Sequence, residues 1–327
     1  MAIEIGPGWT IGGGISIVQP PSQATAGWYG GGGAPYVSTI QRITFATDTA
    51  VPSTRGPMTA VRYVLTGVGN LNYGWFAGGQ LPPNTPRCYS LVDRVTYTTD
   101  TATATPKASL NNNNAYLASA GNTNYGWITG GWQYPTSPFT LSSVQRIDYS
   151  NDTTTPSVRG PLNAGRYQHS GTGSSDYGYF GGGSPFPLSS VERITYASDT
   201  GTASVRGPLS SSRYGSGAST DSTTYGWFGG GEAGYPGYGS FSTVDRITYA
   251  TDTTTASVRG PLSLARYGMA ATGNTSYGWF GGGQTYTPSA LSSRVDRIDY
   301  STDTATATAR TSLTSALTGP GGASGVQ

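Results

Sequence analysis

The chain is poor in the residue types on which metal, redox and charge-driven chemistry depend. Its 327 residues include one cysteine, one histidine and one lysine, only 10% are charged, and the formal net charge is +2. A single cysteine, Cys88, excludes an intramolecular disulfide framework. A single histidine, His169, is too few for a histidine-based zinc or copper site. The basic residues form no cluster of the kind typical of nucleic-acid binders. We therefore expect no cofactor, no metal and no nucleic acid among the ligands.

Long hydrophobic runs are also missing. No apolar stretch reaches the roughly 20 residues that a transmembrane helix needs. The first residues lack the basic and apolar regions of a signal peptide. We therefore expect no membrane insertion and no export by the signal-peptide route.

Glycine and tyrosine are abundant, with 50 and 23 copies, and they recur at a fixed spacing. The stretch Tyr277-Gly278-Trp279-Phe280-Gly281-Gly282-Gly283 is repeated at 225–231. Near-copies lie at 177–183, 125–131 and 73–79, and a shortened copy at 28–33. A period of about fifty residues indicates a repeat architecture, in which neighbouring units bury one continuous core.

Each unit contains four short motifs and no helical periodicity. They are Arg-Tyr followed by small residues, the aromatic-glycine stretch, Val-x-Arg-Ile-x-Tyr, and an outer Arg-Gly-Pro-Leu after an Asp-Thr turn. Enrichment in β-branched and aromatic residues favours strands. Six units of four antiparallel strands predict an all-β fold, a six-bladed β-propeller over residues 23–318.

The ends of the repeat predict how the ring closes. The first unit has no Arg-Tyr motif before Trp28, whereas the last unit is followed by a surplus segment at 314–318. We expect this segment to cross the seam and become the innermost strand of the first blade. Residues 1–22 lie outside the repeat and alternate in short stretches, which indicates a small N-terminal β arm. Residues 319–327 are interpreted as a Gly-rich tail.

The unit resembles a kelch repeat, with a small-residue strand after Arg, a strand ending in paired glycines and a strand ending in Tyr. It departs from that pattern in its outer strand, where Arg-Gly-Pro-Leu replaces the expected Trp. Residues 24–318 carry this resemblance. The repeat, together with the opening stretch 5–15, also resembles structural proteins of marine tailed phages that infect cyanobacteria. This resemblance implies a virion protein, associated with tail fibre or capsid and made in the host cytoplasm.

The repeated charges are interpreted as scaffold. An Arg in the third motif is followed six residues later by an Asp in every unit, and identical placement in six units favours a structural ion pair over a ring of ligands. The arginines are Arg42, Arg94, Arg146, Arg193, Arg246 and Arg297, and the aspartates are Asp48, Asp100, Asp152, Asp199, Asp252 and Asp303. The turns contain no EF-hand loop, so a calcium site is not expected.

Catalytic motifs find little support. His169 follows Arg166-Tyr167-Gln168, where other units carry small residues, so we interpret it as a variant inner-strand residue and not as a general base. Cys88 has no histidine near it in sequence. The acidic residues outside the repeat positions, Asp176, Asp221 and Glu232, are too scattered for a glycosidase or lyase site.

Segments that differ between units are the better candidates for binding. The connection after the glycines varies in length and is rich in aromatics, and it should share one rim with the Arg-Tyr motif. Loop aromatics supply binding area at low entropic cost. The predicted binding residues are Trp132, Tyr134, Phe139, Phe186, Tyr235, Tyr238 and Tyr286, with Arg62, Arg166, Arg213 and Arg266.

Together these observations predict a non-enzymatic virion component. Its rim would bind a host-surface glycan or protein, or a neighbouring virion protein, and its arm would anchor it to other virion proteins. The anchor residues are Ile3, Ile5, Trp9, Ile11, Ile15 and Ile17. The alternatives are a cellular kelch-type interaction module and a propeller glycosidase or lyase. The former would predict partner domains, and the latter several non-repeating acids near the channel.

Overall fold

The computed structural model describes residues 24–81, 88–135, 137–219, 222–234 and 237–324. The predicted arm 1–22, with its anchor residues, lies outside the described residues, as does Tyr235.

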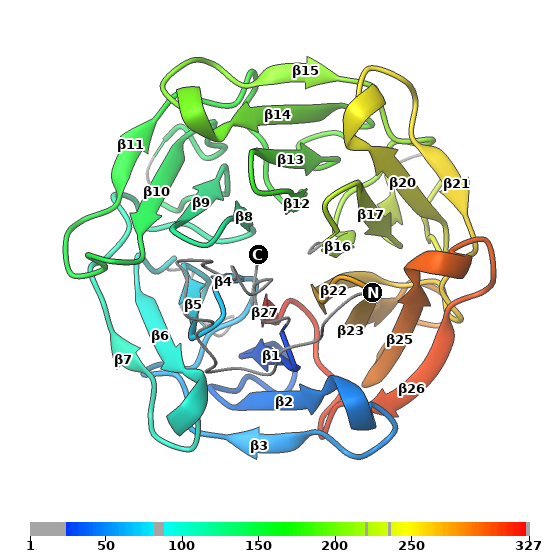
Figure 1. Ribbon diagram of the computed structural model, residues 1–327, viewed down its shortest axis with the longest axis horizontal. Helices are drawn as coiled ribbons and strands as arrows, with labels where there is room; N and C mark the ends of the chain where they lie inside the picture. Colours follow the sequence, from blue (N-terminus) through cyan, green and yellow to red (C-terminus); the bar gives the residue numbers. More distant parts are fainter. Residues whose placement is uncertain (1–23, 82–87, 136, 220–221, 235–236, 325–327) are drawn as a thin grey trace, which may run out of the picture.

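Each unit of the repeat forms one four-stranded antiparallel sheet, and six such sheets stand around a central axis (Figure 1). The prediction of a six-bladed β-propeller is therefore confirmed. The innermost strands are β27 (Gly321–Ser324), β4 (Thr66–Gly69), β8 (Ala118–Gly121), β12 (Ser170–Gly173), β16 (Gly217–Ser219) and β22 (Tyr267–Gly273). The second strands are β1 (Ala26–Gly30), β5 (Tyr73–Ala77), β9 (Tyr125–Thr129), β13 (Tyr177–Gly181), β17 (Tyr225–Gly229) and β23 (Tyr277–Thr285).

The outer half of each blade has the charged third motif and a short edge strand. The third strands are β2 (Ile40–Thr44), β6 (Val92–Thr96), β10 (Val144–Asp148), β14 (Val191–Thr195), β20 (Val244–Thr248) and β25 (Arg294–Asp299). The fourth strands are β3 (Ser53–Arg55), β7 (Thr105–Pro106), β11 (Ser157–Arg159), β15 (Ser204–Arg206), β21 (Ser257–Arg259) and β26 (Thr308–Ser312). Three further strands lie in connections, β18 (Glu232–Ala233), β19 (Gly239–Ser240) and β24 (Ala290–Leu291).

The only helices in the described residues are single 3₁₀ turns between third and fourth strands. They are η1 (Phe45–Thr47), η2 (Tyr97–Thr99), η3 (Tyr196–Ser198), η4 (Tyr249–Thr251) and η5 (Tyr300–Thr302). None of them has the length and hydropathy needed to cross a membrane.

The ring closes through the C-terminal strand, as predicted, but the position of that strand was predicted wrongly. β27 (Gly321–Ser324) pairs with β1, in register from Gly27↔Ser324 to Gly30↔Gly321. The predicted segment 314–318 contributes only the isolated bridge Gly33↔Thr318. In five blades the inner strand starts after the Arg-Tyr segment, which bends at a residue with positive φ, whereas β22 includes Tyr267. Leu317 occupies the Arg position in the first blade. The closing strand therefore lies in the segment interpreted as a Gly-rich tail.

Neighbouring blades are joined by a repeated cluster, which we call the junction latch. One blade supplies the second-strand Trp and the third-strand Arg, and the next blade supplies the Asp and a ring that stacks on the Trp. In the latch of the seam, the Trp279 indole donates to Asp48 over 2.9 Å, Arg297 pairs with Asp48 at 3.0 Å, and Phe45 stacks on Trp279 at 3.9 Å. The interpretation of these charges as scaffold is confirmed.

The same latch occurs at the other five junctions. Its Asp accepts from Trp28, Trp75, Trp127, Tyr179 and Trp227 over 2.8 to 2.9 Å. The tyrosines Tyr97, Tyr149, Tyr196, Tyr249 and Tyr300 provide the stacked rings. Charge-assisted hydrogen bonds combined with stacked aromatics stabilise a buried junction more than either alone. The seam is thus held by the same contacts as every other junction.

The outer Arg-Gly-Pro-Leu motif touches the next blade at its glycine. The Gly260 amide donates to the Asp303 carbonyl over 2.8 Å. A Cβ at this position would lie 1.8 Å from the Ala305 carbonyl oxygen. Glycine is therefore used here for close approach of two backbones.

Candidate binding rim

One end of the propeller carries two kinds of connection, and we call it the rim face. The antiparallel order of each blade brings the connection between second and third strands to the same end as the connection that leads into the first strand. The opposite end carries tight turns such as Asn274–Ser276, in which the Asn274 side chain accepts from the Ser276 and Tyr277 amides. The variable segments of the sequence are therefore all displayed on the rim face.

The four arginines predicted to bind ligands on this rim are buried. Their side chains are at most 2% exposed, and each pairs with the residue before the third-strand Arg of its own blade. The pairs are Arg62–Asp93 at 2.7 Å, Arg213–Asp245 at 2.9 Å, Arg266–Asp296 at 3.2 Å, and Arg166–Glu192. This corrects the prediction, because these guanidinium groups point into the blade and do not face a ligand.

The remaining two blades show why these pairs exist. Where the Arg is replaced, by Leu317 in the first blade and Asn114 in the third, the partner is the neutral amide Gln41 or Gln145. The glutamine oxygens still accept a backbone amide, from Thr314 and from Asn111, each over 2.6 Å. Carboxylates occur only where a guanidinium is present, as expected for charges that must be compensated when buried.

The residues two places after the Arg position of each blade are joined by six backbone hydrogen bonds, which form a closed ring around the channel axis. Each residue donates its amide to the carbonyl of the equivalent residue in the preceding blade, over 2.7 to 3.0 Å. The members are Val64, Tyr116, Gln168, Gly215, Gly268 and Gly319, and all six have φ between 51° and 66°. This left-handed conformation is costly for residues other than glycine, and for a β-branched residue above all.

Three of the six ring members nevertheless carry side chains, and they are consecutive. Val64, Tyr116 and Gln168 belong to the second, third and fourth blades, whereas glycines occupy the other half. A non-glycine residue held in this conformation is a marker of sites where a side chain is needed. The half of the rim face over these three blades is therefore the candidate site.

Four tyrosines gather there, and we call them the tyrosine cluster: Tyr36, Tyr63, Tyr116 and Tyr167. Tyr36 meets Tyr63 edge to face at 5.0 Å, and Tyr116 meets Tyr167 at 6.0 Å. All four are half-buried. Burial raises the pKa of Tyr116, and the neighbouring Tyr63, Cys88, Tyr167 and Tyr36 raise it further.

Sequence reasoning used the Arg-Tyr motif to define the repeat and assigned the Tyr no role. The usable signal was the change at the ring position, where Tyr116 stands in place of a glycine.

The predicted loop aromatics lie farther out on the same face. Trp132, Tyr134 and Phe139 form a stacked row with centroids 5.6 and 6.3 Å apart. Tyr238 of the fifth blade stacks on Tyr286 of the sixth at 5.8 Å, with planes 1° apart. Phe186 stands apart from both groups and is 76% exposed. The loop aromatics therefore form separate groups and not one continuous surface.

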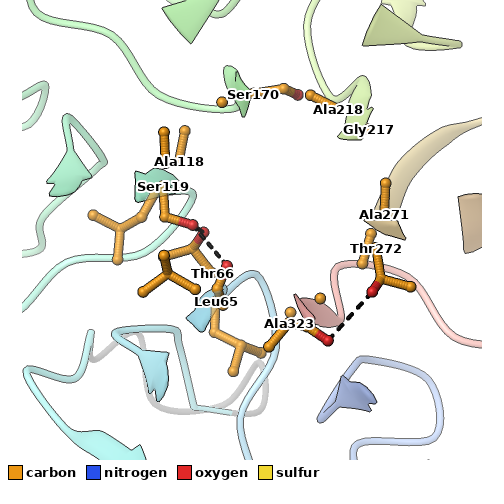
Figure 2. A pocket seen from close by; sticks show the side chains of 18 of the residues that line it. Leu65, Thr66, Ala118, Ser119, Ser170, Gly217, Ala218, Ala271, Thr272 and Ala323 are labelled. Atoms are coloured by element: carbon orange, nitrogen blue, oxygen red, sulfur yellow. Dashed lines mark hydrogen bonds between the residues drawn. The ribbon is translucent and has the colours of Figure 1, made fainter. Parts of the chain in front are cut away.

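The channel below the ring is lined by small side chains of the innermost strands (Figure 2). Its cavity of about 120 Å³ is lined by the first strands of all six blades, mostly by Gly, Ala, Ser and Thr. Hydrogen bonds cross between blades, from Thr66 to Ser119 over 2.7 Å and from Thr272 to the Ala323 carbonyl over 3.3 Å. Within the part of the chain that the structure describes, no carboxylate, lysine or arginine lines this cavity.

His169, the single histidine of the chain, lies at the channel wall, and its imidazole is buried and has a hydrogen-bond partner. Its Nε2 lies 2.9 Å from the Thr129 hydroxyl, and its side chain is buried. Burial, with Arg166 as a second cause, holds the pKa of His169 well below its ordinary value. Among the described residues, no group of three or more His, Cys, Asp or Glu side chains is placed to hold a metal ion.

Comparison with known proteins supports the fold. No protein-family model matches the chain. No curated protein matches its sequence. Among solved structures, 327 chains match, and they include the structure of YjhT, with a TM-score of 0.70 and 12% sequence identity over 88% of this chain and 94% of that one. At this identity the likeness shows a β-propeller and nothing about ligand or activity.

Proposed function

We propose that this propeller is a non-catalytic binding module of a phage particle, and that the tyrosine cluster on its rim face binds a glycan of the host surface. The observation that carries the proposal is Tyr116, a large side chain held in the left-handed conformation at the channel mouth beside three other tyrosines. Tyrosine rings offer apolar faces for sugar rings, and their hydroxyls both donate and accept hydrogen bonds.

The assignment to a virion rests on the resemblance of the repeat to kelch-like repeats in cyanobacterial phage structural proteins. In this proposal the β arm 1–22 attaches the propeller to other virion proteins. The non-catalytic part is supported by the channel, whose lining carries no carboxylate, and by the buried His169. Enzymes that act on sugars usually need a pair of carboxylates at the site.

The test is a glycan array probed with the intact chain and two matched variants. Tyr116→Gly removes the aromatic ring while supplying the residue found at this position in three other blades. Val64→Gly makes the same backbone change without loss of an aromatic. We expect Tyr116→Gly to weaken glycan binding about tenfold or more, as loss of one well-packed aromatic contact does, and Val64→Gly to weaken it much less because no aromatic ring is lost.

Equal binding by both variants would refute the role of the cluster, and an array without any signal would refute glycan binding. The virion assignment has a separate test. Particles assembled with a chain that lacks residues 1–22 should not incorporate the propeller, and normal incorporation would refute the anchor.

A further inference from the structure

The fifth blade contains a buried carboxylate that has no cationic partner among the described residues. Glu232, in β18, is 8% exposed. In the described residues nine other carboxylates are buried, and each of them pairs with an arginine, in one case with a lysine as well. Glu232 has no such pair. An uncompensated buried charge is costly, which makes it a candidate for a ligand contact.

Tyrosines surround this carboxylate on the rim face. Tyr214 pairs with Glu232 in a backbone bridge, with amide-to-carbonyl distances of 2.8 and 3.2 Å. The Tyr214 hydroxyl donates toward the carboxylate, and burial together with Glu232 raises the pKa of Tyr214 to about 12. Tyr267 of the next blade packs against Gly215, the residue after Tyr214, and Glu232 contributes to its raised pKa after burial. Ser240 pairs with Glu232 between β18 and β19, and its hydroxyl accepts from the amide of Tyr286, whose ring stacks on Tyr238.

Elsewhere in the propeller, an arginine lies between a carboxylate and the face of a tyrosine ring. In five blades the third-strand Arg lies over a Tyr ring, 4.1 to 4.5 Å from its centroid, and pairs with an Asp at 2.7 to 3.0 Å. Arg246, for example, lies between Tyr225 and Asp303. Glu232 also lies beside a tyrosine, Tyr214, but no arginine or lysine of the described residues pairs with it.

We propose that Glu232, with Tyr214 and Tyr267, forms a subsite for a cationic nitrogen, an ammonium or guanidinium group carried by the ligand. The carboxylate supplies the counter-charge, and the ring faces attract the cation through their quadrupoles. The subsite lies on the half of the rim opposite the tyrosine cluster, and it does not rest on glycan binding there. Burial raises the pKa of Glu232, so binding should weaken toward acid pH as a proton replaces the ligand.

The experiment measures binding of small probes to the intact chain by saturation-transfer NMR at neutral pH. Glucosamine and ethylguanidinium carry the cation, and glucose is the neutral match for glucosamine. We expect both cations to bind and glucose to bind at least tenfold more weakly. Glu232→Gln should weaken both cations by about tenfold or more, the effect of a lost close charge pair. Asp176→Asn, which neutralises an exposed acid on the opposite end, should have no effect.

Thermal unfolding separates a ligand site from a structural role. The Gln oxygen can still accept from the Tyr214 hydroxyl, so Glu232→Gln removes only the charge. If an ion pair within the chain compensated that charge, the substitution would lower the midpoint, whereas loss of an uncompensated buried charge should leave it unchanged or raise it. A lowered midpoint, equal binding of glucose and glucosamine, or cation binding unaffected by Glu232→Gln would each overturn the proposal. Preference for glucosamine would indicate an amino sugar as the source of the cation, and preference for ethylguanidinium an arginine side chain. Failure of Tyr116→Gly to affect glycans would leave these results untouched.

Discussion

The buried pair Arg62–Asp93 allows a double-mutant cycle for which the chain provides its own end point. Arg62 donates to the carbonyls of Gly78, Leu91 and Phe76 and to Asp93, over 2.7 to 3.1 Å. Asp93 also accepts from the Thr59 amide and hydroxyl. Neither side chain of the pair is exposed to solvent. The perturbations are Asp93→Gln, Arg62→Leu and the combination, which reproduces the Leu317 and Gln41 pair of the first blade.

Each single substitution leaves one buried charge without its partner, so each should cost about 3–5 kcal/mol of unfolding free energy. Burial lowers the pKa of Arg62 and only Asp93 opposes this strongly, so the guanidinium depends on that carboxylate. The double variant buries no charge and keeps a Gln oxygen for the Thr59 amide. Its cost should be smaller than either single cost, with a coupling energy of roughly 3 kcal/mol or more.

Thermal unfolding followed by calorimetry measures the cycle. A chain of 327 residues has an unfolding entropy of about 0.7 kcal/mol/K, so 3–5 kcal/mol corresponds to a fall of roughly 4–7 °C in midpoint. Asp176→Asn, an exposed acid, is the control and should change the midpoint by less than about 1 °C. If the double variant lost the sum of the single losses, charge compensation would not explain the pattern of arginines and glutamines, and the reasoning would be refuted.

Three further predictions concern stability. Trp227→Phe should lower the unfolding free energy by about 1–3 kcal/mol more than Trp227→Tyr does, because Phe removes the aromatic donor to Asp303, whereas the Tyr hydroxyl can replace the indole, as Tyr179 does one blade earlier. Urea unfolding of the two variants measures this difference, and equal midpoints would contradict the latch. Gly260→Ala should lower the thermal midpoint by a few degrees, since the added methyl displaces a backbone carbonyl, and an unchanged midpoint would argue against the close approach. Burial lowers the pKa of His169, so this histidine contributes stability above about pH 6.5, and that stability is lost at lower pH as the unfolded chain takes up a proton. The variant His169→Leu should therefore show a smaller fall in thermal midpoint between about pH 7.5 and 5. Identical pH profiles of the variant and the original chain would show that the histidine is not held neutral.

The sequence was sufficient for the fold because the repeat aligns six copies of every structural position. The landmark Arg and Asp predicted scaffold contacts, and the latch confirms them. The position of the closing strand was predicted wrongly because the repeated sequence motif marks where a unit begins and not where its first strand becomes extended. The residue two places after the Arg position has a positive φ in every blade, and in five of the six blades the inner strand starts only beyond it.

The site was harder to predict because exposure is not a local property. Arg62 precedes a loop, as surface arginines often do, yet its partner lies 31 residues away on the third strand. The acid that accompanies each Arg, and the Gln that replaces it when the Arg is absent, were visible across the six copies and would have indicated burial. Glu232 was noted as a non-repeating acid, but its lack of a counter-ion becomes evident only when every other buried carboxylate has been assigned a partner.

The junction latch at the seam has a consequence for chain connectivity. The two ends of the described chain meet inside the first blade, where β27 pairs with β1. Trp279, Arg297 and Asp48 nevertheless make the same contacts between the last blade and the first that occur at the other junctions. The order in which the blades are linked is therefore not what holds them in a ring. A circularly permuted gene, with its ends joined and a new start opened in the turn at 274–276, should encode the same closed propeller, and so should one opened at the equivalent turn of another blade.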